Sequence, residues 1–179
     1  MRGKLTVGLL FAVGFLAAAF AWWHGFQRGR RVLALWGADK AAVMRYQSQL
    51  ELAELRPAAN PTNVPTNLPT IRIGDTVWQI ERPQDITRTP GVVHARQALI
   101  DDPSYDWDSP SPPPSAAADW KYLLTFRRDG QTVQLAFAPA PGWLIDVESQ
   151  QVASIAPIRQ GLQKFCAEQF TEDAETGPR

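Results

Sequence analysis

An uninterrupted apolar stretch near the N-terminus constrains this chain more than any other feature. Residues Leu5 to Trp23 contain no charged side chain. As a helix this stretch would be about 28 Å long, which matches the roughly 30 Å hydrocarbon core of a bilayer. Trp22 and Trp23 fall at its far end, where indole rings favour the boundary between membrane and water. The sequence therefore predicts a membrane anchor over residues 1–27, with the lipid bilayer as a partner.

Two alternatives to the anchor stay open. Ala19 and Ala21 flank Phe20 in the small-x-small pattern of a signal-peptide cleavage site, so the segment could be removed after Ala21. The tryptophan pair that continues the apolar run past this point favours retention. The other alternative is a buried core helix, but so long an uncharged run is unusual in a small soluble domain.

Basic residues flank the apolar stretch on both sides and bear on its orientation. Arg2 and Lys4 precede the stretch, while Arg28, Arg30 and Arg31 follow it. The positive-inside rule leans slightly toward a cytoplasmic body. A basic start before an apolar core is nevertheless the usual pattern of exported proteins. We expect the N-terminus inside and the C-terminal body outside the cytoplasmic membrane.

The charge of the chain is balanced overall but divided unevenly along it. The 18 Lys and Arg residues offset the 18 Asp and Glu residues, so no basic excess favours nucleic acid as a partner. Residues 1–56 carry +5, from 8 basic and 3 acidic residues, and residues 57–179 carry −5, from 10 basic and 15 acidic residues. Because the basic part adjoins the expected anchor, attraction to anionic lipid headgroups is its simplest explanation.

Proline-rich stretches divide the rest of the chain into expected units. A basic juxtamembrane segment, residues 28–56, is expected to hold a helix and a short strand. Prolines at every fourth position predict a stiff spacer over residues 57–69. An α+β domain is expected over residues 70–170, with a Pro/Ser-rich loop at 109–118. An acidic tail, residues 171–179, follows it.

Hydrophobic patterns within residues 70–170 predict an antiparallel sheet of about five strands with two or three helices. The clearest hairpin has alternating apolar residues over 120–126 and 133–137, joined by the tight turn Asp129-Gly130. A second hairpin is expected around Gly74-Asp75. The last helix, starting near Pro157, carries an apolar stripe of Ile158, Leu162, Phe165, Cys166 and Phe170. Strands that do not alternate regularly with helices favour an α+β fold.

Candidate catalytic groups are few. One cysteine and two histidines exclude a disulfide within the chain and most zinc sites and catalytic triads. Cys166 lies in an apolar stripe and is expected in the core. His24 adjoins the anchor, and His94 is expected beside the apolar stripe of a helix that begins at Thr89-Pro90. Glycine motifs for phosphate binding are absent from the sequence. We therefore assign no catalytic, cofactor-binding or metal residue and no cofactor.

An acidic stretch is the most suggestive feature of the body. It contains Asp101, Asp102, Asp106 and Asp108, interleaved with Tyr105 and Trp107. Carboxylates on a loop could bind a hard cation such as calcium, or act in pairs on a sugar polymer. The stretch lacks the glycine and the distal glutamate of an EF-hand loop, so helix termination and turn formation explain it more simply. The tryptophans of the body are likewise expected to pack in the core rather than form a ligand platform; they are Trp78, Trp107, Trp120 and Trp143.

A short N-terminus, one span and a small α+β domain form a layout that resembles pilin-like and secretion-system assembly subunits. The resemblance is one of layout alone, because a type IV pilin carries a glutamate early in its apolar run and residues 5–23 contain none. We expect a single-pass, non-catalytic assembly, scaffold or binding module, with a protein partner or a second copy of the chain. The alternative is a membrane-anchored hydrolase of envelope polymers that uses the Asp101–Asp108 carboxylates.

Overall fold

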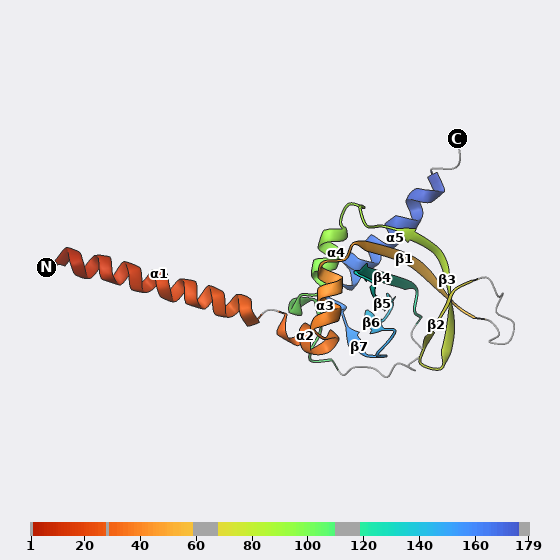
Figure 1. Ribbon diagram of the computed structural model, residues 1–179, viewed down its shortest axis with the longest axis horizontal. Helices are drawn as coiled ribbons and strands as arrows, with labels where there is room; N and C mark the ends of the chain where they lie inside the picture. The colour runs from red at the N-terminus through yellow and green to blue at the C-terminus, as the bar shows by residue number, and fades with distance from the viewer. Residues whose placement is uncertain (1, 28, 59–67, 110–118, 176–179) are drawn as a thin grey trace.

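The fold is taken from a computed structural model, which describes residues 2–27, 29–58, 68–109 and 119–175 (Figure 1). These residues form an α+β fold with five helices and a curled, seven-stranded antiparallel sheet. The helices are α1 (Arg2–Gln27), α2 (Arg30–Trp36), α3 (Ala38–Arg45), α4 (Val92–Leu99) and α5 (Arg159–Glu175). The strands are β1 (Gln49–Pro57), β2 (Thr70–Ile73), β3 (Thr76–Asp85), β4 (Tyr122–Arg128), β5 (Gln131–Ala138), β6 (Trp143–Asp146) and β7 (Val152–Ser154). Two short 3-10 turns, Asp102–Ser104 and Ala156–Ile158, complete the elements.

The first strand in the chain lies inside the sheet, not before it. The strand order is β2-β3-β1-β4-β5-β6-β7, so β1 pairs with β3 on one side and β4 on the other. The sequence placed residues 28–56 in a separate juxtamembrane segment ahead of the spacer. In the structure, β1 lies in the same sheet as β2 to β7. Most of the spacer between β1 and β2, residues 59–67, lies outside the described residues, as do residues 110–118 of the Pro/Ser-rich loop.

The two expected hairpins are confirmed, and local backbone chemistry explains both. Asp129 and Gly130 have φ of 49° and 79°, the positive values that a two-residue type I′ turn requires. This turn sets the register of β4 against β5, with Phe126 opposite Val133. Gly74, with φ of 57°, begins the turn between β2 and β3. The sheet has seven strands rather than about five, because β7 has only three residues and β1 joins from before the spacer.

The two faces of the sheet bury different sets of side chains. Paired residues Leu52 and Leu124 face the helices, while their neighbours Ala53 and Leu123 point to the opposite face, as the two-residue period of a strand requires. On the helix face, the fully buried side chains include Met44, Leu99, Phe126, Phe137 and Cys166. Inside the curl of the sheet, the core consists of residues such as Ile71, Trp78, Ile80, Trp120 and Ile145.

Helix α5 confirms the predicted apolar stripe. Leu162 and Cys166 are buried, and Ile158, Phe165 and Phe170 pack partly buried against the same core. The phenyl ring of Phe170 stacks on Tyr122 of β4, with centroids 6.0 Å apart. The helix continues to Glu175, so the first part of the expected acidic tail is helical, whereas residues 176–179 lie outside the described residues.

Helix α1 projects away from the body as a rod (Figure 1). Side chains are described for its residues 11–23, and all of them are exposed, including Phe11, Phe15 and Trp23 at 77%, 77% and 56%. Among the described residues, no helix is both long and apolar enough to cross a membrane. The apolar stretch of the predicted anchor begins at Leu5, six residues before the described side chains, and the anchor over residues 1–27 stays a prediction.

Candidate functional site

The sequence-derived nucleophile and histidine candidates do not come together in the described structure. The Cys166 thiol is fully buried in the helix-face core, and burial raises its pKa to about 12. It therefore stays protonated and packs as a small apolar group, which confirms the expectation for this residue. His94 is exposed on α4 and lines a groove of about 420 Å³ between α4 and α5. The side chain of His24 lies outside the described residues.

Carboxylates of the acidic stretch accept hydrogen bonds from backbone amides. Oδ1 of Asp102 accepts a hydrogen bond from the amide of Val32 at 2.9 Å, and Oδ2 accepts one from the amide of Arg31 at 3.3 Å. Asp102 thus accepts hydrogen bonds from backbone N–H groups in the first turn of α2 that have no partner within the helix. The helix dipole also stabilises its negative charge at this end. Asp106 accepts a hydrogen bond from the Ser109 hydroxyl at 2.5 Å. This bond lowers the pKa of Asp106 below its usual range.

The same stretch carries the aromatic contacts that fasten α2 to the body. The Trp36 indole N–H donates to the Tyr105 hydroxyl at 2.9 Å, and that hydroxyl donates to the carbonyl of Leu99 at 2.6 Å. The Trp107 indole donates to the carbonyl of Asp102 at 2.8 Å. Burial raises the pKa of Tyr105, so its hydroxyl remains a donor. Tyr105 and Trp107 therefore act here as packing and hydrogen-bonding residues, and packing is what the sequence predicts for Trp107.

No group of three or more His, Cys, Asp or Glu side chains in the described residues is arranged to hold a metal ion. The carboxylates of the acidic stretch illustrate why. Asp102 points to the amides of α2, whereas Asp106 closes a local turn with Ser109. Side chains committed to different backbone groups do not converge on one cation.

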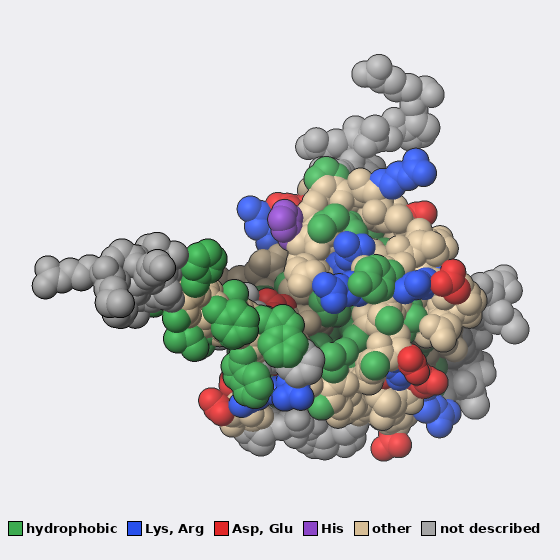
Figure 2. All heavy atoms as spheres, turned by 60° about the vertical axis from the view of Figure 1, so that its left-hand side comes forward, with side chains coloured by type: hydrophobic (Ala, Val, Ile, Leu, Met, Phe, Trp, Pro, Cys, Tyr) green, Lys and Arg blue, Asp and Glu red, His purple; other side chains and the backbone are tan. Residues whose placement is uncertain are grey.

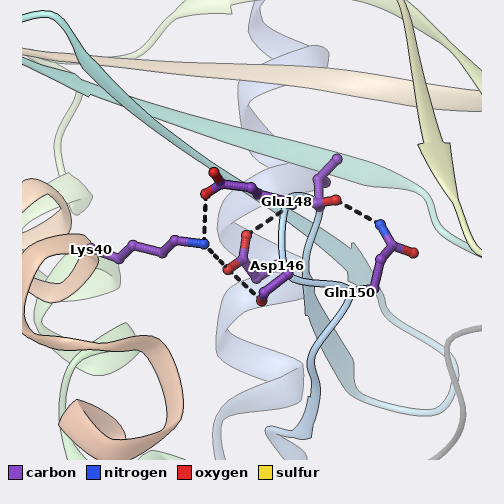
Figure 3. A network of polar contacts seen from close by, with 6 residues as sticks. Lys40, Asp146, Glu148 and Gln150 are labelled. Atoms are coloured by element: carbon purple, nitrogen blue, oxygen red, sulfur yellow. Dashed lines mark hydrogen bonds and ion pairs between the residues drawn. The ribbon is translucent and has the colours of Figure 1, made fainter.

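The strongest polar constellation of the body is one that the sequence did not predict (Figure 3). Asp146, at the end of β6, has a side chain only 2% exposed. Its carboxylate is ion-paired with the Lys40 ammonium of α3 and accepts hydrogen bonds from the Ser149 hydroxyl at 2.7 Å and the Glu148 amide at 3.1 Å. Glu148, which is 78% exposed, lies 2.8 Å from the same ammonium on its solvent side. The network therefore joins α3 to the turn between β6 and β7.

The electrostatics of this network favour a fixed ion pair over proton transfer. Burial by itself would raise the pKa of Asp146, but the hydrogen bonds from Lys40 and Ser149 outweigh it and lower the pKa. Burial by itself would lower the pKa of Lys40, but its bonds to Asp146 and Glu148 outweigh it and raise the pKa. Both groups are thus charged at neutral pH. Neither is poised to exchange a proton near pH 7, which is what a general acid or base requires.

The turn that carries Asp146 also reaches the far end of the curled sheet. Gln150, with φ of 58°, donates from its side-chain amide to the carbonyl of Arg72 at 3.2 Å and of Val147 at 2.6 Å. Its side-chain oxygen accepts from the amide of Gly74 at 2.7 Å. One turn therefore fastens the β2–β3 hairpin through Gln150 and α3 through Asp146. Figure 3 shows both side chains on this turn.

A basic and aromatic cluster lies beside the base of α1. We call Arg45, Tyr46 and Arg128 the basic patch. The two guanidinium groups lie over the Tyr46 ring, 5.6 Å and 5.2 Å from its centroid, and Tyr46 is 58% exposed. Arg45 and Tyr46 line a hollow of about 410 Å³ together with Gly29, the residue that opens α2. Figure 2 shows basic side chains gathered around a hydrophobic one on this face of the body.

Comparison of the chain with protein families, with curated proteins and with solved structures finds no match in any of the three.

Proposed function

We propose that this chain is a single-pass membrane protein whose body is a non-catalytic assembly or binding module. The observation that carries the proposal is α1. Its described residues, 11–23, are apolar on every side of the helix and exposed. A helix that packs against a protein on one side keeps a polar face toward water. A helix that lacks a polar face suits a lipid environment. The sequence continues the apolar run back to Leu5, which gives the length a bilayer requires.

The body supports the second half of the proposal. Its buried carboxylate, Asp146, forms a fixed ion pair with Lys40, and its thiol at Cys166 is inaccessible. The hydrolase hypothesis gains no support from the acidic stretch, because Asp102 and Asp106 bind backbone amides and a neighbouring hydroxyl. A rigid domain held near a membrane without assembled reactive groups is suited to binding another molecule. We propose that the N-terminus lies inside and the body outside the cytoplasmic membrane.

A matched pair of substitutions tests the anchor. Leu16→Arg places a charge near the centre of the apolar stretch, where arginine costs roughly 2.5–3.5 kcal/mol of insertion free energy. Leu68→Arg makes the same exchange at a side chain 41% exposed on the body. We expect Leu16→Arg to increase the fraction of chain released by an alkaline carbonate wash and Leu68→Arg to leave it unchanged. Equal release of both variants would contradict a membrane-spanning α1.

Two further measurements test the orientation and the role of the body. A protease should remove a C-terminal tag from cells whose outer envelope is opened and whose cytoplasmic membrane is intact, because we place the body outside the cytoplasmic membrane. Protection of the tag until the inner membrane is opened would reverse this orientation. Mild detergent extraction should recover the chain with a stoichiometric protein partner or as an oligomer. Recovery as a monomer with hydrolytic activity toward an envelope polymer would refute the non-catalytic role.

A further inference from the structure

We propose that the basic patch of Arg45, Tyr46 and Arg128 docks against anionic phospholipid headgroups of the membrane in which α1 is embedded. This inference rests on the proposed function, because it requires α1 to hold the body at that membrane. It adds a second contact with the bilayer and a preferred lipid class.

The short link between α1 and α2 decides which face of the body meets the membrane. Helix α1 ends at Gln27 and α2 begins at Arg30, so three Cα–Cα steps separate them and span at most about 11 Å. From Trp23 to Gln27 the helix rises roughly 6 Å. With Trp23 at the boundary of the hydrocarbon core, the body begins within about 17 Å of it. The headgroup region takes up roughly 5–7 Å of this distance, and the remainder is comparable to the ~10 Å screening length at 0.1 M salt.

The hollow beside the basic patch lies at this junction. Gly29 belongs to the link and lines the hollow together with Arg45 and Tyr46, so we expect these two side chains close to the headgroup layer. Leu33 of α2, 46% exposed, lines the hollow as well and offers an apolar side chain. Figure 1 shows that α1 departs from the end of the body at which α2 and α3 lie.

The chemistry of the patch suits phosphate headgroups. Arg45 is exposed and forms no ion pair with another described residue, so its charge is available to a lipid phosphate. Arg128 is partly neutralised by Asp129, whose carboxylate lies 3.0 Å from its Nε. Stacking over Tyr46 orients both guanidinium groups without removing their hydrogen-bond donors. A tyrosine that is 58% exposed, as Tyr46 is, suits the membrane–water interface, where tyrosine is enriched.

Lipid is favoured over a protein as the occupant because of position. A protein partner could bind any exposed face, whereas this face is brought to the membrane by a two-residue link. The apolar groove between α4 and α5 offers no comparable constraint, since nothing in the structure indicates what would cover it.

The test uses the full-length chain in two kinds of nanodisc, one of phosphatidylcholine alone and one with a third of phosphatidylglycerol. Amide hydrogen exchange is measured over residues 38–48 and 127–132. We expect slower exchange in the anionic discs, and loss of that difference at 1 M salt, where the screening length falls to about 3 Å. One basic residue near an anionic surface changes binding roughly fivefold. Arg45→Glu/Arg128→Glu removes two positive charges and adds two negative ones, so it should lower the docking equilibrium constant by at least about 25-fold.

A matched double variant serves as the control. Arg72→Glu/Lys164→Glu reverses two exposed basic side chains that do not line the hollow, and it should keep the wild-type protection. Equal exchange of the wild-type chain in both kinds of disc would overturn the inference, and so would equal protection of the patch variant. If the patch variant does not fold, the lipid and salt dependence of the wild-type chain still decides. Release of the chain by carbonate would instead refute the proposed function.

Discussion

Lys40→Met should destabilise the body by leaving the Asp146 carboxylate buried without its counter-charge. Removing one partner of a buried ion pair typically costs about 3–5 kcal/mol. Here the Lys40 side chain is 24% exposed, and Asp146 keeps its bonds from Ser149 and the Glu148 amide. We therefore expect a smaller loss of unfolding free energy, about 2–3 kcal/mol. For a chain of this length the melting temperature should fall by about 4–12 °C.

Urea and thermal unfolding of the full-length chain in a mild non-ionic detergent measure this loss. Lys164→Met is the matched control, because Lys164 is 78% exposed and 3.7 Å from Glu168, a pair worth less than about 0.5 kcal/mol. Adding Asp146→Asn to Lys40→Met removes the unpaired charge and should recover part of the stability. A loss of unfolding free energy below about 0.5 kcal/mol in Lys40→Met would contradict a stabilising Lys40–Asp146 ion pair. Strict additivity of the two substitutions would contradict it as well.

The ion pair between Lys40 and Asp146 predicts that the free energy of unfolding falls at two edges of its pH profile, one at acid pH and one at alkaline pH. The folded-state pKa of Asp146 is lowered, so its contribution is present above the unfolded value near 4 and is lost as pH falls through the folded pKa. The pKa of Lys40 is raised, so its contribution is present below the unfolded value near 10.5 and is lost as pH rises through the folded pKa. Urea titrations should show that Lys40→Met flattens both edges relative to Lys164→Met; unchanged edges would contradict this assignment.

Three further predictions follow from single contacts. Tyr105→Phe removes the acceptor of the buried Trp36 N–H, and chemical denaturation should show a loss of about 1–3 kcal/mol; an unchanged midpoint would argue against the bond. Cys166 should resist a thiol reagent in the folded chain and react fully in urea, because it is buried and its pKa is about 12; fast labelling of the folded chain would contradict its burial. Gln150→Ala should speed exchange of the Gly74 amide at least several-fold while the core stays protected, whereas equal rates would show that the turn does not clamp the hairpin.

Elements with strong local signals could be predicted from the sequence. The β4–β5 hairpin has a turn, Asp129-Gly130, that matches its strands, and α5 has a regular apolar stripe. Helix α2 and strand β7 were not predicted. With seven and three residues, they are too short for a clear periodic pattern, and their stability comes from tertiary contacts such as the Asp102 cap.

Contacts between distant residues could not be predicted in the same way. Lys40 and Asp146 are 106 positions apart, and neither belongs to a dense local cluster of charges. The one available signal was an aspartate directly after the apolar residues 143–145, which places a charge at the buried end of a strand. By contrast, the acidic stretch drew attention because of its local density, although its carboxylates serve nearby amides. The central place of β1 was likewise hidden, because the proline-rich residues that follow it separate it from its partners in sequence.

The most direct test of the central claim is the intact mass of the chain in washed membranes. Cells producing the full-length protein are fractionated, the membranes are washed with alkaline carbonate, and the retained protein is weighed by mass spectrometry. We expect retention of the uncleaved chain at 19.9 kDa. A chain that begins at Trp22, or one recovered in the carbonate supernatant, would contradict a membrane-spanning α1.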